Sequence, residues 1–182
     1  LAVDLSDLRS VTRLCDQMQA RNIKLDIAVM NAGLMPLHAR KTPQGYEIMF
    51  AVHFLANRLL LARWCRDGVL PLQGRRADVP RVVFVSSEAH QSSAPIDFDH
   101  FAAFHHYGIK DGMKFYGQSK LHLSTFAQEL HRRLNPNGEL NVAVHSLCPG
   151  VYAYAYDDGM GLAQCPAGTV YDVTFYCPAG QE

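Results

Sequence analysis

Three apolar runs alternate with helical segments along the first 150 residues, and this alternation limits the fold more than any other feature of the chain. The runs lie at 25–33, 81–86 and 140–150, and each ends in a turn or a polar sequence. Continuous apolar runs of this length are typical of strands buried on both faces, as in a parallel sheet. Strands that alternate with helices predict βαβ units. We therefore expect an α/β domain with a doubly wound parallel sheet.

The segments between these runs repeat apolar residues at helical spacing. Three helices are predicted, over about residues 6–22, 42–67 and 115–134. Ser6 is a suitable cap for the first helix, and Thr42-Pro43 suits the start of the second. The third is expected to stop at the Asn-Pro-Asn-Gly sequence that follows Leu134. No period is visible over 88–113, so we expect a long functional loop there with at most a short helix.

Composition excludes several classes of protein. The 182 residues carry 17 basic and 17 acidic side chains, so no basic excess exists to neutralise nucleic-acid phosphates. A hydrophobic content of 48% is too high for a disordered chain. Five scattered cysteines do not form a disulfide framework and suggest a reducing, cytoplasmic location. No apolar run approaches the roughly 18 residues of a membrane span, and no signal peptide is visible.

The sequence pattern changes after Gly150. Residues 151–182 show neither a helical period nor a charged face, and Cys-Pro-Ala-Gly occurs twice, at 165–168 and 177–180. Two copies cannot support a repeat fold. We expect residues 1–150 to form the domain and 151–182 to be an irregular tail, with a small Cys-rich module as the alternative.

A histidine-rich stretch lies within the long loop. It combines three histidines with two aspartates, namely His100, His105, His106, Asp97 and Asp99. A metal site needs defined geometry and supporting partners, which this spacing does not indicate. We expect a solvated or substrate-facing loop and no metal site.

Tyr116 and Lys120 are four residues apart on the predicted third helix, so they share one face. Ser86 and Ser87 end a buried strand, and in open α/β sheets ligands bind at those strand ends. A phenol, whose pKa in water is about 10, can act as an acid-base only if a nearby cation such as a lysine ammonium favours the phenolate. A serine hydroxyl can hold a carbonyl or carbinol oxygen. Together these groups suit proton transfer coupled to hydride transfer.

The order of five motifs resembles the short-chain dehydrogenase/reductase family over about residues 1–151. The motifs are VDLSDL, DIAVMNAG, RVVFVSS, YGQSK and SLCPG, in that order. YGQSK is similar to the family's Tyr-x-x-x-Lys signature, and Ser87 aligns with its catalytic serine. The spacing from Ser87 to Tyr116 and the sequences IDFDHF and RVVFVSSEAH resemble the retinol-dehydrogenase-like branch.

The resemblance implies a role for each matching residue. Tyr116 would be the acid-base, Lys120 would contact the nicotinamide ribose and lower the tyrosine pKa, and Ser87 would orient the substrate. The implied cofactor contacts are Asp4 and Leu5 at the adenine, Asn31, Ala32 and Gly33 in the cleft, and Pro149, Gly150 and Val151 at the nicotinamide.

The chain departs from the family pattern at three places. His53 stands where the family has an asparagine that supports a proton-relay water, so it is expected to be either a polar relay or a neutral packing residue. The threonine that usually follows the Pro-Gly motif is missing from VYAYAYDDG. No Gly-rich turn precedes the first motif, so we expect an N-terminally truncated, Rossmann-like sheet that lacks its first two strands.

The activity implied by the resemblance is NAD(P)-dependent interconversion of an alcohol and a carbonyl on a small lipophilic substrate. The choice between NAD and NADP is not readable, because the segment that reads the ribose 2′ position is missing. The family also makes a homodimer a fair expectation. The alternative is a non-catalytic remnant that acts as an interaction or dimerisation module.

Overall fold

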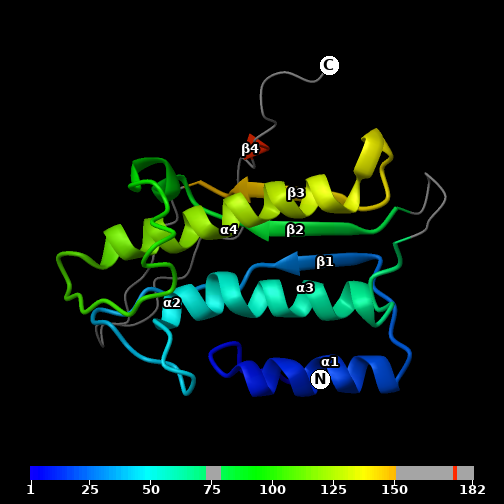
Figure 1. Ribbon diagram of the computed structural model, residues 1–182, viewed down its shortest axis with the longest axis horizontal. Coiled ribbons are helices and arrows are strands. Elements are labelled where there is room, and N and C mark those ends of the chain that lie inside the picture. The colour runs from blue at the N-terminus through cyan, green and yellow to red at the C-terminus, as the bar shows by residue number, and fades with distance from the viewer. Residues whose placement is uncertain (73–78, 151–173, 176–182) are drawn as a thin grey trace, which may run out of the picture.

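The computed structural model describes residues 1–72, 79–150 and the backbone of Thr174–Phe175. Helices and strands alternate through these residues, as predicted (Figure 1). In chain order the elements are α1 (Leu8–Ala20), β1 (Ile27–Met30), α2 (Ile48–Phe50), the π-helical turn η1 (Ala51–Leu55), α3 (Ala56–Arg66), β2 (Arg81–Val85), the 3₁₀ helix η3 (Glu88–Ser92), α4 (Gly112–Leu134), the 3₁₀ helix η4 (Pro136–Gly138), β3 (Ala143–Cys148) and β4 (Thr174–Phe175).

The strands form one sheet in the order β1-β2-β3-β4. β1 pairs with β2 and β2 pairs with β3 in parallel, with Val29 opposite Val83 and Val83 opposite His145. Two residues of β4 pair with the end of β3 in the antiparallel direction. The predicted α/β class and the parallel arrangement of the three main strands are therefore confirmed.

The core lies between one face of this sheet and the layer formed by α1, α3 and α4 (Figure 1). Ala28 and Met30 of β1 and Val82 and Phe84 of β2 point into it. The three helices contribute Val11, Cys15, Met18, Ala56, Leu60, Leu61, Trp64, Leu123, Ala127 and Leu130. One apolar stripe on each helix thus meets one face of the strands.

The prediction that the strands are buried on both faces is wrong for β1. Its residues alternate between buried and exposed, and Ile27 and Val29 are each 58% exposed. The physical reason is that α1, α3 and α4 all pack against the opposite face of the sheet. An apolar run therefore predicted the strand correctly but did not predict how many layers cover it.

Two predicted helix starts are also wrong. Asp7, not Ser6, caps α1, and its carboxylate accepts a hydrogen bond from the Arg9 amide. Thr42 begins a turn instead of a helix, because its carbonyl accepts from Gly45 N at 2.9 Å. The helix begins at Ile48, where the carboxylate of the preceding residue, Glu47, caps the Phe50 amide.

Residues 1–3 begin no strand in the structure, although the sequence there is apolar. Within the described residues one continuous helix, Ile48–Arg66, is long and apolar enough to cross a membrane by length and composition. Most of it is buried inside the molecule (61% of the tested window), where Leu60 and Leu61 belong to the core. Its apolar character therefore serves packing against the sheet.

Candidate active site

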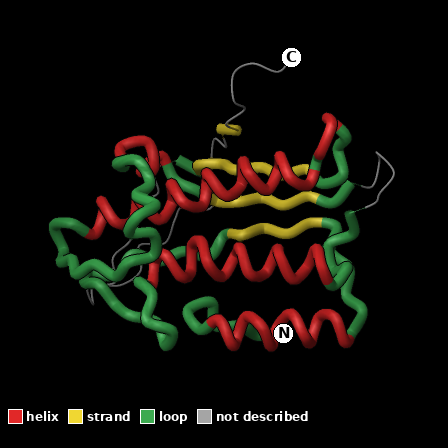
Figure 2. Tube along the Cα trace, in the orientation of Figure 1, coloured by secondary structure: helices red, strands yellow, loops and turns green. Residues whose placement is uncertain are grey.

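The carboxyl ends of β1, β2 and β3 lie at the same edge of the sheet, because the three strands are parallel. Loops gather at this edge (Figure 2). Three predicted site segments leave the strands here, namely 31–33 after β1, 86–87 after β2 and 149–150 after β3. The N-terminal half of α4 supplies Tyr116 and Lys120. The topology thus brings together segments that are more than one hundred residues apart in sequence.

Lys120 is buried beside the end of β2 and is only 3% exposed. Its Nζ donates a hydrogen bond to the Val85 carbonyl at 2.9 Å and lies 5.5 Å from the centre of the Tyr116 ring. Burial penalises the charged ammonium and lowers the pKa of Lys120 to about 8. The predicted Tyr-Lys pair therefore exists as a close pair, with the cation on the inner side.

The two serines at the end of β2 have different surroundings. Ser86 is buried, and its Oγ lies 2.7 Å from the Ser124 Oγ of α4. Ser87 is half-buried and caps η3, where its Oγ accepts from the Ala89 amide at 3.3 Å. His90 Nδ1 lies 2.5 Å from the Ser87 carbonyl oxygen, to which it donates. Of the two hydroxyls, that of Ser87 is therefore the one with surface open to a ligand.

His53 links the turn after β1 to the Tyr-bearing helix. It is fully buried, and its Nε2 accepts from the Leu34 amide at 3.0 Å. Its Nδ1 lies 2.7 Å from Ser119 Oγ, and that hydroxyl donates to the Tyr116 carbonyl at 2.7 Å. Because Nε2 is the acceptor, Nδ1 carries the proton. Burial, together with the nearby Lys120 charge, lowers the pKa of His53 to about 3, so the imidazole is neutral.

Two features of this connection were not predicted from the sequence. Ser119 lies 66 residues from His53, and nothing in its local pattern marks it as a partner. His53 also lies within the π-helical turn η1, where Asn57 Nδ2 donates to its carbonyl at 2.9 Å. π-helical turns often occur at functional sites, but apolar periodicity does not reveal them.

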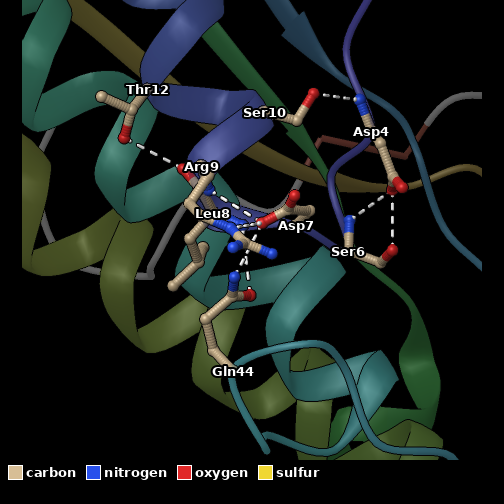
Figure 3. A network of polar contacts seen from close by, with 8 residues as sticks. All are labelled: Asp4, Ser6, Asp7, Leu8, Arg9, Ser10, Thr12 and Gln44. Atoms are coloured by element: carbon tan, nitrogen blue, oxygen red, sulfur yellow. Dashed lines mark hydrogen bonds and ion pairs between the residues drawn. The ribbon is translucent and has the colours of Figure 1, made fainter.

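Four of the predicted cofactor residues line one cavity of about 430 Å³, namely Asp4, Leu5, Ala32 and Gly33. The segment before α1 is held in a polar network (Figure 3). Asp4 Oδ1 accepts from the Ser6 amide at 2.9 Å and from its hydroxyl at 2.7 Å. The cavity thus has one wall before α1 and another at the turn after β1, as the resemblance implies for a cofactor cleft.

The same network ties the start of α1 to the loop before α2 (Figure 3). Gln44 Nε2 donates to Asp7 Oδ1 at 2.7 Å, and Gln44 Oε1 accepts from the Leu8 amide at 3.3 Å. The Gln44 hydrogen bond holds the pKa of Asp7 below its usual range. These contacts fix the wall of the cavity that Asp4 and Leu5 form.

Gly33 is the point where the cavity meets the buried pair. A Cβ at this position would lie 3.3 Å from His53 Nε2 and 3.6 Å from Lys120 Nζ. The missing side chain therefore lets the turn after β1 approach both residues. Asn31 precedes this turn and is exposed.

The remaining predicted residues lie at or beyond the end of β3. Pro149 and Gly150 follow the strand, and Gly150 has a φ of +92°, which suits glycine. Val151, the tail 151–182 and both Cys-Pro-Ala-Gly copies lie outside the described residues, apart from the two-residue strand β4. In the long loop, His100 pairs with Asp97 at 2.8 Å on the surface. Across the described residues no three metal-ligating groups lie close enough to hold an ion.

No family model matches the chain. It is 35% identical over 151 residues to the short chain dehydrogenase rstn4 of Aspergillus nomiae, covering 72% of this chain and 39% of that protein. It is 34% identical over 154 residues to human retinol dehydrogenase 14, covering 82% of this chain and 40% of that protein. It is 33% identical over 168 residues to the human WW domain-containing oxidoreductase, covering 85% of this chain and 36% of that protein. The chain spans less than half the length of these relatives.

Solved structures agree with these relatives. An uncharacterized protein from Mycobacterium paratuberculosis superimposes with a TM-score of 0.64 at 29% identity, over 81% of this chain and 48% of that one. The Pseudomonas aeruginosa RhlG complex with NADP gives a TM-score of 0.57 at 21% identity, over 84% of this chain and 52% of that one. The Rossmann-like α/β fold predicted from the motifs is therefore confirmed.

Proposed function

The chain belongs to the short-chain dehydrogenase/reductase family, and from this premise we propose that it serves the NAD(P)-dependent interconversion of an alcohol and a carbonyl on a small lipophilic substrate. One observation carries the proposal. Gly33, on the wall of the 430 Å³ cavity, adjoins Lys120, whose Nζ lies 5.5 Å from the centre of the Tyr116 ring. A binding cavity thus opens directly beside a candidate acid-base pair.

Each residue at this edge of the sheet has a proposed task. Tyr116 gives a proton to the carbonyl oxygen or removes one from the alcohol. Lys120 favours the phenolate through its charge, which it largely keeps below a pH of about 8. The half-buried Ser87 orients the substrate oxygen. His53, engaged at both ring nitrogens, holds the helix carrying Tyr116 against the turn after β1.

A nicotinamide cofactor suits the residues present around the cavity. Its chemistry, when bound, is to give or accept the hydride. Asp4 and Leu5 would hold the adenine end, Ala32 and Gly33 with Asn31 would line the cleft, and Pro149, Gly150 and Val151 would border the other end. Among the similar structures, RhlG was solved with NADP and 4-hydroxyisoleucine dehydrogenase with NADH. Either cofactor is compatible with the proposal.

Cofactor binding and turnover test this proposal separately. Titration with NADH and NADPH should give saturable changes in nicotinamide fluorescence, and octanal should then be reduced with loss of the reduced-nicotinamide absorbance. Tyr116→Phe should lower turnover by about 10²–10⁴-fold while cofactor binding stays unchanged. Tyr46→Phe, outside the site, is the matched control and should keep full turnover. Absence of binding at millimolar cofactor would refute the enzyme proposal for this chain.

A non-catalytic interaction or dimerisation module is the second candidate, and the exposed face of β1 favours it. Ile27 and Val29 present an apolar surface on the side of the sheet away from the helices. An exposed apolar patch of this kind is typical of interaction sites. Saturable association without any cofactor binding would select this candidate over the enzyme.

A further inference from the structure

A second cavity, of about 310 Å³, lies on another side of α4 from the Tyr-Lys pair. Its walls come from the start of the long helix, the loop 94–105 and the N-terminal half of α4. The lining residues that matter here are Phe50, Phe101, Phe115, Gln118, Ser119 and His122. None of them lines the cofactor cavity.

Helical geometry separates the two sites. Phe115, Ser119 and His122 follow one another at spacings of four and three, so they share a face of α4. Tyr116 and Lys120 are each displaced by one residue, about 100° around the helix, from Phe115 and Ser119. The second cavity is therefore not the far end of the cofactor cleft, although Ser119 contacts both neighbourhoods.

Aromatic rings form the apolar wall of this cavity. Phe101 meets Phe50 edge to face at 5.5 Å and His122 at 5.3 Å between ring centres. Phe98 stacks on Phe101 at 6.0 Å and is 76% exposed. Rings arranged in this way present both faces and edges to an incoming planar molecule. Lys114 and two carboxylates also line the cavity. Asp97 pairs with His100, and Glu47 accepts from the Tyr107 hydroxyl and the Phe50 amide. Because both carboxylates are engaged within the protein, the cavity suits a neutral ligand.

His122 supplies a single directed polar group in this apolar setting. The residue is 9% exposed, and its Nδ1 lies 2.6 Å from the Gln118 carbonyl, to which it donates. Burial lowers the pKa of His122, so the ring is neutral and Nε2 is an acceptor. Within the described part of the chain, Nε2 has no hydrogen-bond partner. Trp64 Nε1 is the only fully buried side-chain nitrogen or oxygen without a partner among the described residues, so Nε2 of His122 keeps some open surface on an otherwise buried side chain and can accept from a donor on a ligand.

We propose that this cavity is a second small-molecule site, which binds a neutral planar aromatic carrying one hydrogen-bond donor, of the phenol or indole class. The ring lies among Phe50, Phe101 and Phe115, and the donor bonds to Nε2 of His122. This site goes beyond the oxidoreductase function proposed above and does not depend on it.

Fluorine NMR with para-fluorophenol tests the site. The probe should bind saturably, and fluorobenzene, which lacks the donor, should bind about fivefold more weakly, since one neutral hydrogen bond contributes about 1 kcal/mol. His122→Phe keeps an aromatic ring and removes the acceptor, so it should weaken para-fluorophenol about fivefold and leave fluorobenzene unchanged. Thr125→Val, on the exposed side of α4, is the matched control and should change neither.

A second measurement covers the case in which His122→Phe does not fold. In ¹⁵N-histidine-labelled protein, para-fluorophenol should move the Nε2 resonance of His122 and leave its Nδ1–H tautomer in place. Equal affinity for para-fluorophenol and fluorobenzene would overturn the proposal. So would competition between para-fluorophenol and NADH for the protein, or a loss of para-fluorophenol binding when copies of the chain associate. Failure of cofactor binding alone leaves this result untouched, so the two proposals fail separately.

Discussion

His53 shows how one residue connects the parts of the candidate site. The family resemblance leaves open a polar relay or a neutral packing role at this position. In the structure both ring nitrogens are engaged, one with the Leu34 amide and one with Ser119. A relay would have to break one of these bonds and charge a fully buried ring. The geometry therefore favours a positioning role through Ser119, whose hydroxyl holds the Tyr116 carbonyl.

Acid should destabilise the fold through His53. Its pKa falls from 6.5 to about 3 on folding, so below about pH 6.5 the unfolded chain takes up a proton that the native state excludes. The free energy of unfolding should therefore decrease as pH falls from 6.5 toward 3, by on the order of 1 kcal/mol per pH unit. Urea denaturation at several pH values in this window measures the slope.

His53→Gln removes the titrating group and should flatten this slope between pH 6.5 and about 4.5, leaving the smaller contribution of His122. Nearer pH 3, carboxylates whose pKa folding lowers, such as Glu129, add a slope of their own in both proteins. Val52→Ala provides the control, since it removes only methyl groups from a buried neighbour. It should lower stability at every pH without changing the slope. A slope that His53→Gln leaves as steep as in the parent would show that the imidazole is not the group that titrates.

At the scale of elements, the packing of η3 against α4 places Ser87. A Cβ on Gly117 would lie 2.5 Å from the Ala89 carbonyl oxygen and 2.7 Å from Ser93 Oγ. Such distances are too short, so Gly117→Ala must push η3 away from the helix. We expect a loss of about 1–3 kcal/mol in the free energy of unfolding, together with faster amide exchange across Glu88–Ser92.

Gly112→Ala is the matched control on the same helix. The Cβ added there would meet Pro36 O at 3.8 Å, an ordinary contact. Because alanine favours helix over glycine by up to about 1 kcal/mol, this variant should be neutral or slightly more stable. If Gly117→Ala were equally harmless, the stability of the fold would not depend on the close approach of η3 to α4.

The sequence predicts the elements well and their contacts poorly. α4 was expected over 115–134 and spans Gly112–Leu134, because its apolar stripe and its stop sequence are local signals. The start of the second helix was misplaced because Thr42-Pro43 suits a turn as well as a cap, and the choice depends on the Glu47 carboxylate. Three other features depend on residues that are distant in sequence, so no local pattern encodes them. They are the close approach of Gly33 to His53 and Lys120, the packing of η3 against α4, and the hydrogen bond between Ser119 and His53.

At the scale of the whole molecule, the described chain is a sheet covered by helices on one face. It spans less than half the length of the relatives that it matches, and it carries the Tyr-Lys pair beside a cavity of about 430 Å³. The apolar runs correctly predicted strands of a parallel sheet. They could not predict that Ile27 and Val29 would be exposed, because exposure depends on what packs against the sheet.

This exposed face should make the chain associate with itself. Replacing Ile27 and Val29 together by threonine keeps β-branched side chains on β1 and removes apolar surface. Sedimentation velocity should then show less concentration-dependent association, while stability changes by only about 0.5 kcal/mol, since both positions are 58% exposed. Val82→Thr, at a fully buried position of β2, should instead cost about 1–3 kcal/mol because it buries a hydroxyl. Unchanged association in the double variant would mean that another surface drives it.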